Sequence, residues 1–299
     1  MNRISGRQAL SAGFGVIARE PAAFLVWCVV CFALGVVPQM LTIGPTLAML
    51  GAMADGGGAS SPEVLAAQAQ AMRYQPIIYL CSLAAVVLVP GAIFRAVLFP
   101  EDRGIMYLRV GARELWMALI VIVLFVMYFI AIFVGMIPFL IVVGMAGFMA
   151  RDGGSPLGLG LLAAVLMLAL IGVLLWGLLR FSLAPVMAFA EKTFRLTESW
   201  SLTRGHAGKM LLVAVALTVL TLLVEVVIFG VFFAWAGSVV SLPALTADPQ
   251  GALTTLGVPF LTAAGIAFSL LSGAAYTVWG ATWADIYRQL AVKPSDVFA

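Results

Sequence analysis

A single acidic residue, Glu225, lies near the middle of a long apolar segment, where a carboxyl group could take up a proton or an ion. At the centre of a membrane-spanning helix an acidic side chain costs at least about 2.5 kcal/mol, so Glu225 is expected to face other helices or water. Thr221 and Thr218 precede it on the same helical face and extend it into a polar stripe. Two interpretations follow: a protonated carboxyl group hydrogen-bonded to Thr221 or Tyr276, or a pathway for an ion, a proton or a substrate.

The other residues with chemical potential do not form a catalytic pattern. His206, the single histidine, lies in a basic linker between Arg204 and Lys209, where we expect it to face solvent or lipid headgroups. Cys28 and Cys31 have the spacing of a redox or metal pair, but they sit in an apolar run without a second cysteine pair or a nearby histidine. We therefore expect small buried thiols, no metal, no cofactor and no enzymatic activity.

These residues belong to a chain that is too apolar for a water-soluble globular protein. Of its 299 residues 64% are hydrophobic and 10% charged, whereas soluble domains are about 45–50% apolar and about 25% charged. The net charge of +3 is small, so nucleic acid is not an expected partner. Six segments reach the length of about 20 apolar residues that a spanning helix requires: 22–50, 76–99, 115–148, 157–180, 210–238 and 256–284.

The sequence therefore predicts an all-α integral membrane protein with six transmembrane helices, in which residues 1–299 form a single transmembrane domain. Residues 51–75 are expected to hold a glycine turn and a short helix beginning at Ser61 or Pro62. Pro138, in the third segment, is the only obvious site for a kink within a span.

Basic residues are concentrated on one side of this topology. Of the 16 Lys and Arg residues, only Arg73 and Arg151 fall outside the N-terminal segment, the linkers after the second and fourth spans, and the C-terminal tail. The positive-inside rule then places both termini in the cytoplasm, as an even number of spans requires. Basic side chains there either bind anionic headgroups or serve only as a topology signal; the headgroup candidates are Arg95, Arg109, Arg180, Arg195, Arg204 and His206.

A threefold pattern follows the even-numbered spans, each of which ends in an arginine with a proline five or six residues later. Such an arginine can extend to the headgroups while the proline ends the helix. The three copies are Arg95 with Pro100, Arg180 with Pro185, and Arg288 with Pro294.

Each odd-numbered span is preceded by an amphipathic stretch, expected as an in-plane helix at the cytoplasmic interface. These stretches are residues 7–14, 106–112 and 195–200. Together the two patterns indicate three units, each with an interfacial helix and a transmembrane hairpin, over residues 1–100, 101–185 and 186–299. The alternative is that any linker next to a membrane carries arginine and small residues.

The sixth span carries a face of small residues that permits close helix approach. We expect this face to pack against another span, with self-association of the protein as the alternative. Its residues are Ser269, Gly273, Thr277 and Gly280.

The third unit resembles the membrane domain that precedes some glycerophosphoryl diester phosphodiesterases, and related bacterial inner-membrane proteins of unassigned function. The resemblance rests on Arg180, Pro185, Glu191 and the run Ser199-Trp-Ser-Leu-Thr-Arg-Gly205. It is clearest over residues 176–212 and weaker over 86–120. The resemblance implies a six-helix fold in a bacterial inner membrane. It does not imply phosphodiesterase activity, because the hydrolase of those enzymes is a separate soluble barrel for which this chain has no stretch.

The expected function is that of a non-enzymatic inner-membrane scaffold, assembly factor or accessory subunit. Its expected partners are the lipid bilayer and another membrane protein or complex. The alternative is a small transporter or lipid-handling protein that uses Glu225 as a polar switch. The weakness of that alternative is that Glu225 is a single carboxyl group without a matched partner, whereas transporters usually build their sites from several polar groups at interrupted helices.

Overall fold

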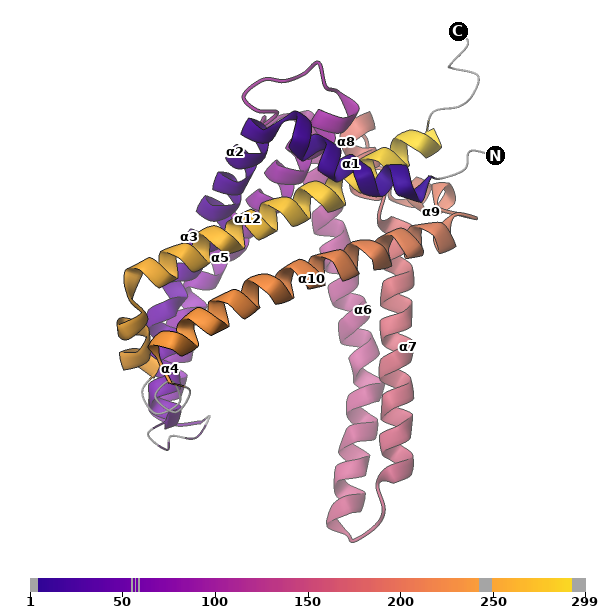
Figure 1. Ribbon diagram of the computed structural model, residues 1–299. Coiled ribbons are helices and arrows are strands. Elements are labelled where there is room, and N and C mark those ends of the chain that lie inside the picture. Colours follow the sequence, from indigo (N-terminus) through magenta and orange to yellow (C-terminus); the bar gives the residue numbers. More distant parts are fainter. Residues whose placement is uncertain (1–4, 55, 57, 59, 242–248, 292–299) are drawn as a thin grey trace. The chain divides into compact units, whose positions relative to one another are not determined.

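The computed structural model describes residues 5–54, 56, 58, 60–241 and 249–291 (Figure 1). No strand occurs among these residues. The chain divides into two compact units, which are described separately. The larger unit comprises residues 5–110 and 212–288, and the described part of the smaller unit comprises residues 111–211 and 289–291.

Within the described residues, six helices are long and apolar enough to cross a membrane. The expectation of an all-α, multi-pass membrane protein is thereby confirmed at this level. The six helical spans are Pro21–Met53, Pro62–Leu98, Ala112–Arg151, Leu157–Glu191, Ala207–Val239 and Phe260–Ala291.

The larger unit begins with α1 (Gly6–Arg19), a helix with one buried face. The side chain of Ser5 accepts a hydrogen bond from the backbone N–H of Gln8 and so caps the first turn. Glu20 follows the helix, and Pro21 then occupies the first turn of α2 (Pro21–Cys31), where its missing N–H is not needed.

The first span is not a regular helix after α2. Residues Phe32–Val36 form a π-helical turn, α3 (Val37–Gln39) contains Pro38, and Met40–Thr42 form a 3₁₀ turn before α4 (Ile43–Ala54). Proline has no N–H to donate and its ring crowds the preceding turn, which accounts for the irregular hydrogen bonding around it. The expectation that Pro138 is the only break within a span is therefore wrong.

The segment expected to hold a separate short helix is instead part of a long one. Helix α5 (Pro62–Leu98) is capped by Ser61, as the sequence indicates, but it continues through Pro76 and Pro90 to the end of the second span. Membrane helices tolerate such prolines, because neighbouring helices and local adjustments satisfy the freed backbone groups.

The larger unit is completed by α10 and α12. Helix α10 (Ala207–Val239) is continuous, and it passes into the larger unit at residue 212. Helix α12 (Pro249–Ala291) is interrupted at Gly257, whose φ of 72° and ψ of 175° are not helical. This break falls where the sixth span was expected to begin, and glycine alone adopts such a conformation without steric cost.

The smaller unit is built on α6 (Ala112–Arg151) and α7 (Leu157–Phe181), which lie side by side in Figure 1 and are joined by the turn at residues 152–156. Two short helices follow, α8 (Ala184–Glu191) and α9 (Leu196–Leu202). The core of this unit joins α6 to α8, with partly buried apolar residues of α6 and α9 packed against it. The fully buried members are Ile120, Ala184 and Ala188.

Residues 106–112 differ from the expected in-plane helix. They form a turn in which Met106 and Tyr107 have φ values of 52° and 65°, with an isolated bridge between Ile105 and Leu108. The helical pattern begins only at Ala112, the first residue of α6. Leu108 and Gly111 lie in this turn and at the start of α6. Their spacing is the same as in an interfacial helix, so spacing alone could not distinguish the two structures.

Candidate interfacial site

The larger unit carries a dense set of polar contacts around residues 99–110, hereafter the 99–110 loop. Arg95, near the end of α5, is 2% exposed. Its Nη1 donates to the Tyr107 carbonyl oxygen at 2.5 Å, and its Nε lies 3.4 Å from Asp102 Oδ2. The expectation that Arg95 reaches lipid headgroups is therefore wrong, because its guanidinium group holds the loop from inside the unit.

A second contact holds the adjacent carbonyl of the same loop. Trp27 of α2 is fully buried, and its Nε1 donates to the Met106 carbonyl oxygen at 3.0 Å. Met106 and Tyr107 are consecutive residues with a left-handed backbone conformation. This conformation is uncommon for residues other than glycine and carries strain. The buried donors Trp27 and Arg95 each satisfy one of their carbonyls, which stabilises this conformation.

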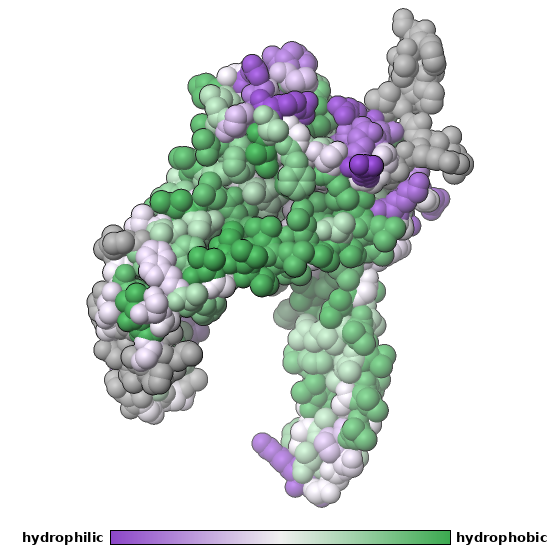
Figure 2. Space-filling model, viewed as in Figure 1, coloured by the Kyte–Doolittle hydropathy of each residue, from purple (hydrophilic) through white to green (hydrophobic). Residues whose placement is uncertain are grey.

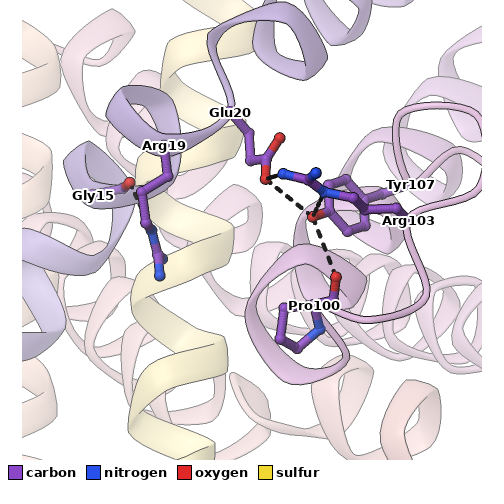
Figure 3. A network of polar contacts seen from close by, with 6 residues as sticks. All are labelled: Gly15, Arg19, Glu20, Pro100, Arg103 and Tyr107. Atoms are coloured by element: carbon purple, nitrogen blue, oxygen red, sulfur yellow. Dashed lines mark hydrogen bonds and ion pairs between the residues drawn. The ribbon is translucent and has the colours of Figure 1, made fainter.

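Glu20 joins the loop to the junction of α1 and α2 (Figure 3). Its carboxylate forms an ion pair with the Arg103 guanidinium group and lies 3.3 Å from the Tyr107 hydroxyl group. Arg103 Nε also donates to the Tyr107 hydroxyl oxygen at 3.2 Å. The hydrogen bond from Arg103 lowers the pKa of Glu20 and raises that of Arg103 itself, since each charge favours the other.

Arg109, another headgroup candidate, is exposed and lies 3.6 Å from Asp102 Oδ1. The carboxylate of Asp102 therefore faces both Arg95 and Arg109. Of the six headgroup candidates, Arg95 and Arg109 are thus brought together by a shared acidic residue.

A polar cavity of about 220 Å³ lies in the larger unit between α1, the end of α5 and the last turns of α12. Its charged lining residues are Arg19, Asp285 and Arg288. Asp285 is 1% exposed and accepts a hydrogen bond from Arg288 Nη2 at 2.5 Å. Arg19 Nε donates to the Gly15 carbonyl oxygen at 3.0 Å. The three-residue spacing of Asp285 and Arg288 on one helix permits this pairing, whereas no sequence pattern indicates the cavity beside it.

In the smaller unit, Arg180 lies beside two tryptophan rings that contact each other edge to face, with centroids 4.6 Å apart. Its guanidinium carbon is 5.7 Å from the ring centroid of Trp176 and 5.4 Å from that of Trp200, within the range of cation–π attraction. Ser199 is fully buried and its hydroxyl group donates to the Arg180 carbonyl oxygen at 2.9 Å. Residues on which the family resemblance rests thus contact one another in this unit.

The other basic candidates of the smaller unit make local contacts. Arg195 Nε forms an ion pair with Glu191 Oε2 at 2.6 Å. Arg204 is exposed and His206 is half-buried, both in the turn that precedes α10, where the His206 N–H donates to the Thr203 carbonyl oxygen at 3.2 Å. These contacts fix the turn and leave Arg204 available at the surface of this unit.

The polar stripe of α10 differs from the first interpretation, a carboxyl group hydrogen-bonded to Thr221 or Tyr276. Thr218 and Thr221 donate to carbonyl oxygens of their own helix at 2.9 Å, and Trp279 Nε1 donates to Thr221 Oγ1 at 3.2 Å. Glu225 is half-buried and makes no hydrogen bond or ion pair with any residue that the structure describes. The expected hydrogen bond from Glu225 to Thr221 or Tyr276 is therefore not formed.

The small residues of α12 lie at contacts with other helices of the larger unit. All four are buried; they are Ser269, Gly273, Thr277 and Gly280. A Cβ atom on Gly273 would lie 2.5 Å from Cys28 Sγ of α2, and one on Gly280 would lie 3.2 Å from Ile93 Cγ2 of α5. Nearby, Thr282 Oγ1 donates to the Ala9 carbonyl oxygen of α1 at 3.1 Å.

Sequence reasoning did not predict the contacts that Glu20, Arg103, Tyr107 and Trp27 make in the 99–110 loop. No local signal could have identified them, because Arg103 is 83 residues from Glu20 and Met106 is 79 residues from Trp27. Among the described residues, no group of three or more His, Cys, Asp and Glu side chains is placed to hold a metal ion.

Comparison with known proteins gives no match, whether with family models, with curated protein sequences or with solved structures.

Proposed function

We propose that this chain is a non-enzymatic protein of the bacterial inner membrane that acts as a scaffold, assembly factor or accessory subunit, engaging lipid or another membrane protein at its polar end. The observation that carries this proposal is the use of charged side chains in the larger unit. Glu20, Arg95 and Asp102 hold a loop against helix ends. These charged side chains are engaged in holding the 99–110 loop in one conformation. A loop held in this way presents a stable surface to a lipid or a protein partner.

The distribution of hydropathy in the larger unit supports an interaction surface at one end. Figure 2 shows hydrophilic residues over the 99–110 loop and hydrophobic residues along α10. Exposed basic side chains of that loop, such as Arg109, can attract anionic headgroups or an acidic partner surface. By the positive-inside rule this end faces the cytoplasm, together with both termini.

The arrangement as three hairpin units also belongs to this proposal. Helices α1 and α9 would be the in-plane helices of the first and third units, and the turn at residues 106–112 would replace the helix in the second. On this proposal, residues 176–212 share with the glycerophosphoryl diester phosphodiesterases the architecture of the membrane domain and not the hydrolase activity. It supplies the proposed bacterial inner-membrane location.

The proposal is tested by purifying the full chain from its native membrane in mild detergent or nanodiscs and identifying what accompanies it by mass spectrometry. A stoichiometric protein partner or one enriched lipid class is the expected result. Arg109→Glu should reduce that association severalfold, whereas Arg151→Glu, which changes the exposed arginine at the end of α6, should not. Purification with neither partner nor enriched lipid, or a measurable turnover, would contradict the proposal.

A second candidate, a small transporter or lipid-handling protein, is favoured by one observation. An apolar cavity of about 100 Å³ is lined by residues that include Thr221, Val224 and Val278, and Val224 directly precedes Glu225 in α10. A carboxyl group next to such a space could switch its protonation as a ligand enters. In proteoliposomes that carry a pH-sensitive dye, Glu225→Gln would abolish proton movement while Thr218→Val would not. Equal proton movement in both variants would exclude this candidate.

A further inference from the structure

We infer that the polar cavity between α1, α5 and α12 is a binding site for a phosphate group, carried either by a lipid headgroup or by a free phosphoryl compound. The inference rests on the proposed function and names the chemistry of its ligand. It starts from the two guanidinium groups of Arg19 and Arg288, which line one cavity of about 220 Å³.

Each arginine is held in place by one contact and keeps further N–H groups for a ligand. Arg19 uses Nε for the Gly15 carbonyl oxygen, so both of its Nη groups remain. Arg288 uses Nη2 for Asp285, so Nε and Nη1 remain. Neither arginine has a further partner among the described residues. Arginine suits phosphate because its planar donor pairs match two oxygens at once.

The charge balance of the cavity favours an anion. Its lining holds two arginines and one carboxylate, Asp285, which is already paired with Arg288. Glu20, the residue after α1, is the acidic group next to Arg19 in the sequence, and Figure 3 shows its side chain directed to Arg103 while Arg19 points elsewhere. Arg19 therefore keeps its positive charge for the cavity.

The cavity also has a neutral donor suited to a further oxygen of a phosphate ester. Ser11 and Gln8 lie about two and about three turns before Arg19 on the lining face of α1. The Ser11 hydroxyl group already donates to the Gln8 carbonyl oxygen, so the side-chain amide of Gln8 is the group that can donate to the ligand. No helix N-terminus is needed, because the attraction comes from the two guanidinium groups.

The position of the cavity connects it to the membrane surface. It is lined by Ala96, Val97 and Pro100, where the apolar α5 ends, and by the last turns of α12. Spanning helices end at the depth of lipid phosphates, and a basic cavity at that depth can receive a headgroup. A soluble phosphoryl compound could reach the same groups from the aqueous side.

The test is a titration of the purified full chain in detergent with three probes: dihexanoyl phosphatidic acid, dihexanoyl phosphatidylcholine and inorganic phosphate. Arg19→Gln and Arg288→Gln should each weaken binding of the best probe about tenfold or more, because each removes a charge-assisted pair of hydrogen bonds. Arg73→Gln, which changes an exposed arginine of α5 outside the cavity, should have no effect. Arg288→Lys should recover part of the loss, since it keeps the charge.

A second pair of variants blocks the cavity without changing any charge. Gly15 lines the cavity, and a Cβ atom built on it meets nothing within 4 Å, so Gly15→Leu can fold while its side chain fills the space. Gly44→Leu in α4 is the matched control, because its Cβ also has open space. Loss of binding in Gly15→Leu alone, with unchanged Tm in both, is the expected result.

The outcomes separate the sources and the proposals. Binding of phosphatidic acid but not inorganic phosphate would assign the site to a headgroup, and equal binding of both would assign it to free phosphoryl compounds. No binding of any probe, or unchanged binding in the Arg19→Gln/Arg288→Gln double variant, would overturn the inference. The proposed function is judged separately by what accompanies the wild-type chain from its native membrane, so the two can fail independently.

Discussion

Glu20 stands where α1 ends and α2 begins, and its carboxylate connects that junction to Arg103 and Tyr107 of the 99–110 loop. A local sequence pattern could not identify it, since its partners are more than eighty residues away. The partners of Arg95 were also not predictable from its local sequence. Its place at the end of an apolar helix is typical of a headgroup-facing arginine, yet a buried carbonyl and Asp102 provide partners inside the unit.

The lowered pKa of Glu20 leads to a prediction about pH. Because the folded pKa lies below the ordinary value of 4.5, this group stabilises the fold above that pH, and its contribution disappears as the pH falls through the lower folded value. We predict that Glu20→Gln lowers the Tm of the detergent-purified protein at pH 7 and that the difference from wild type vanishes in strong acid. Thermal scanning fluorimetry across pH measures this.

The control is Glu101→Gln, which alters an exposed carboxylate of the same loop that has no partner among the described residues. It should leave the Tm nearly unchanged at pH 7. A Glu20→Gln protein as stable as wild type at neutral pH would show that the ion pair with Arg103 contributes nothing.

At the scale of the helices, glycine residues determine how closely α1 and α12 approach each other. Gly13 of α1 lies against α12, and a Cβ atom there would come within 2.5 Å of Val278 Cα. Since that atom is backbone, the helices must separate to admit a methyl group. We predict that Gly13→Ala destabilises the protein by roughly 1–3 kcal/mol, measured by chemical denaturation in detergent.

Gly15 on the same helix provides the matched substitution. A Cβ atom there has open space, so Gly15→Ala should be neutral or stabilise by up to about 1 kcal/mol through helix propensity. Equal effects of the two substitutions would mean that α1 does not pack closely on α12.

The pair of α6 and α7 contains an unsatisfied hydroxyl group. Tyr128 Oη is buried and has no hydrogen-bond partner among the residues that the structure describes, and a Cβ atom on Gly177 of α7 would lie 3.2 Å from it. Leaving a buried hydroxyl group unpaired costs about 1–3 kcal/mol. We therefore predict that Tyr128→Phe raises the free energy of unfolding by about 1 kcal/mol.

The same contact gives a double-mutant comparison. Gly177→Ala should destabilise the wild-type protein, because the new methyl group meets the hydroxyl oxygen, and should cost less in the Tyr128→Phe background. If Tyr128→Phe lowers stability, the hydroxyl group must have a partner that compensates its burial.

At the scale of the whole chain, length and hydropathy were sufficient to predict six helices of spanning length, because each is a long apolar run. Their regularity was not predictable from proline positions. Pro38 lies within an irregular stretch, whereas Pro76 and Pro138 lie within continuous helices. Whether a proline disrupts a helix depends on which neighbours satisfy the freed carbonyl, and that is decided by packing.

The predicted orientation is tested over the whole chain. Green fluorescent protein fused to either terminus should fluoresce, because it folds in the cytoplasm, and alkaline phosphatase fused there should be inactive. A cysteine introduced at Gly153, in the turn between α6 and α7, should react with a membrane-impermeant maleimide from the outside of spheroplasts. Of the three native thiols, Cys28 and Cys31 are buried and should contribute little background, and Cys81, which is partly exposed, is replaced by serine in the labelled protein. The opposite labelling pattern would reverse the proposed topology.

The larger unit is made of two separate stretches of chain, residues 5–110 and 212–288. Residues 111–211, which separate them in the sequence, belong to the smaller unit. During synthesis α1 and α2 therefore emerge long before α12, which supplies their contacts at Gly273, Val278 and Thr282. At about 5–20 residues per second, the interval is on the order of 10 s. For that time the nascent N-terminal helices expose polar and small-residue faces to the translocon or to lipid, so correct assembly depends on the order in which the ribosome delivers the helices.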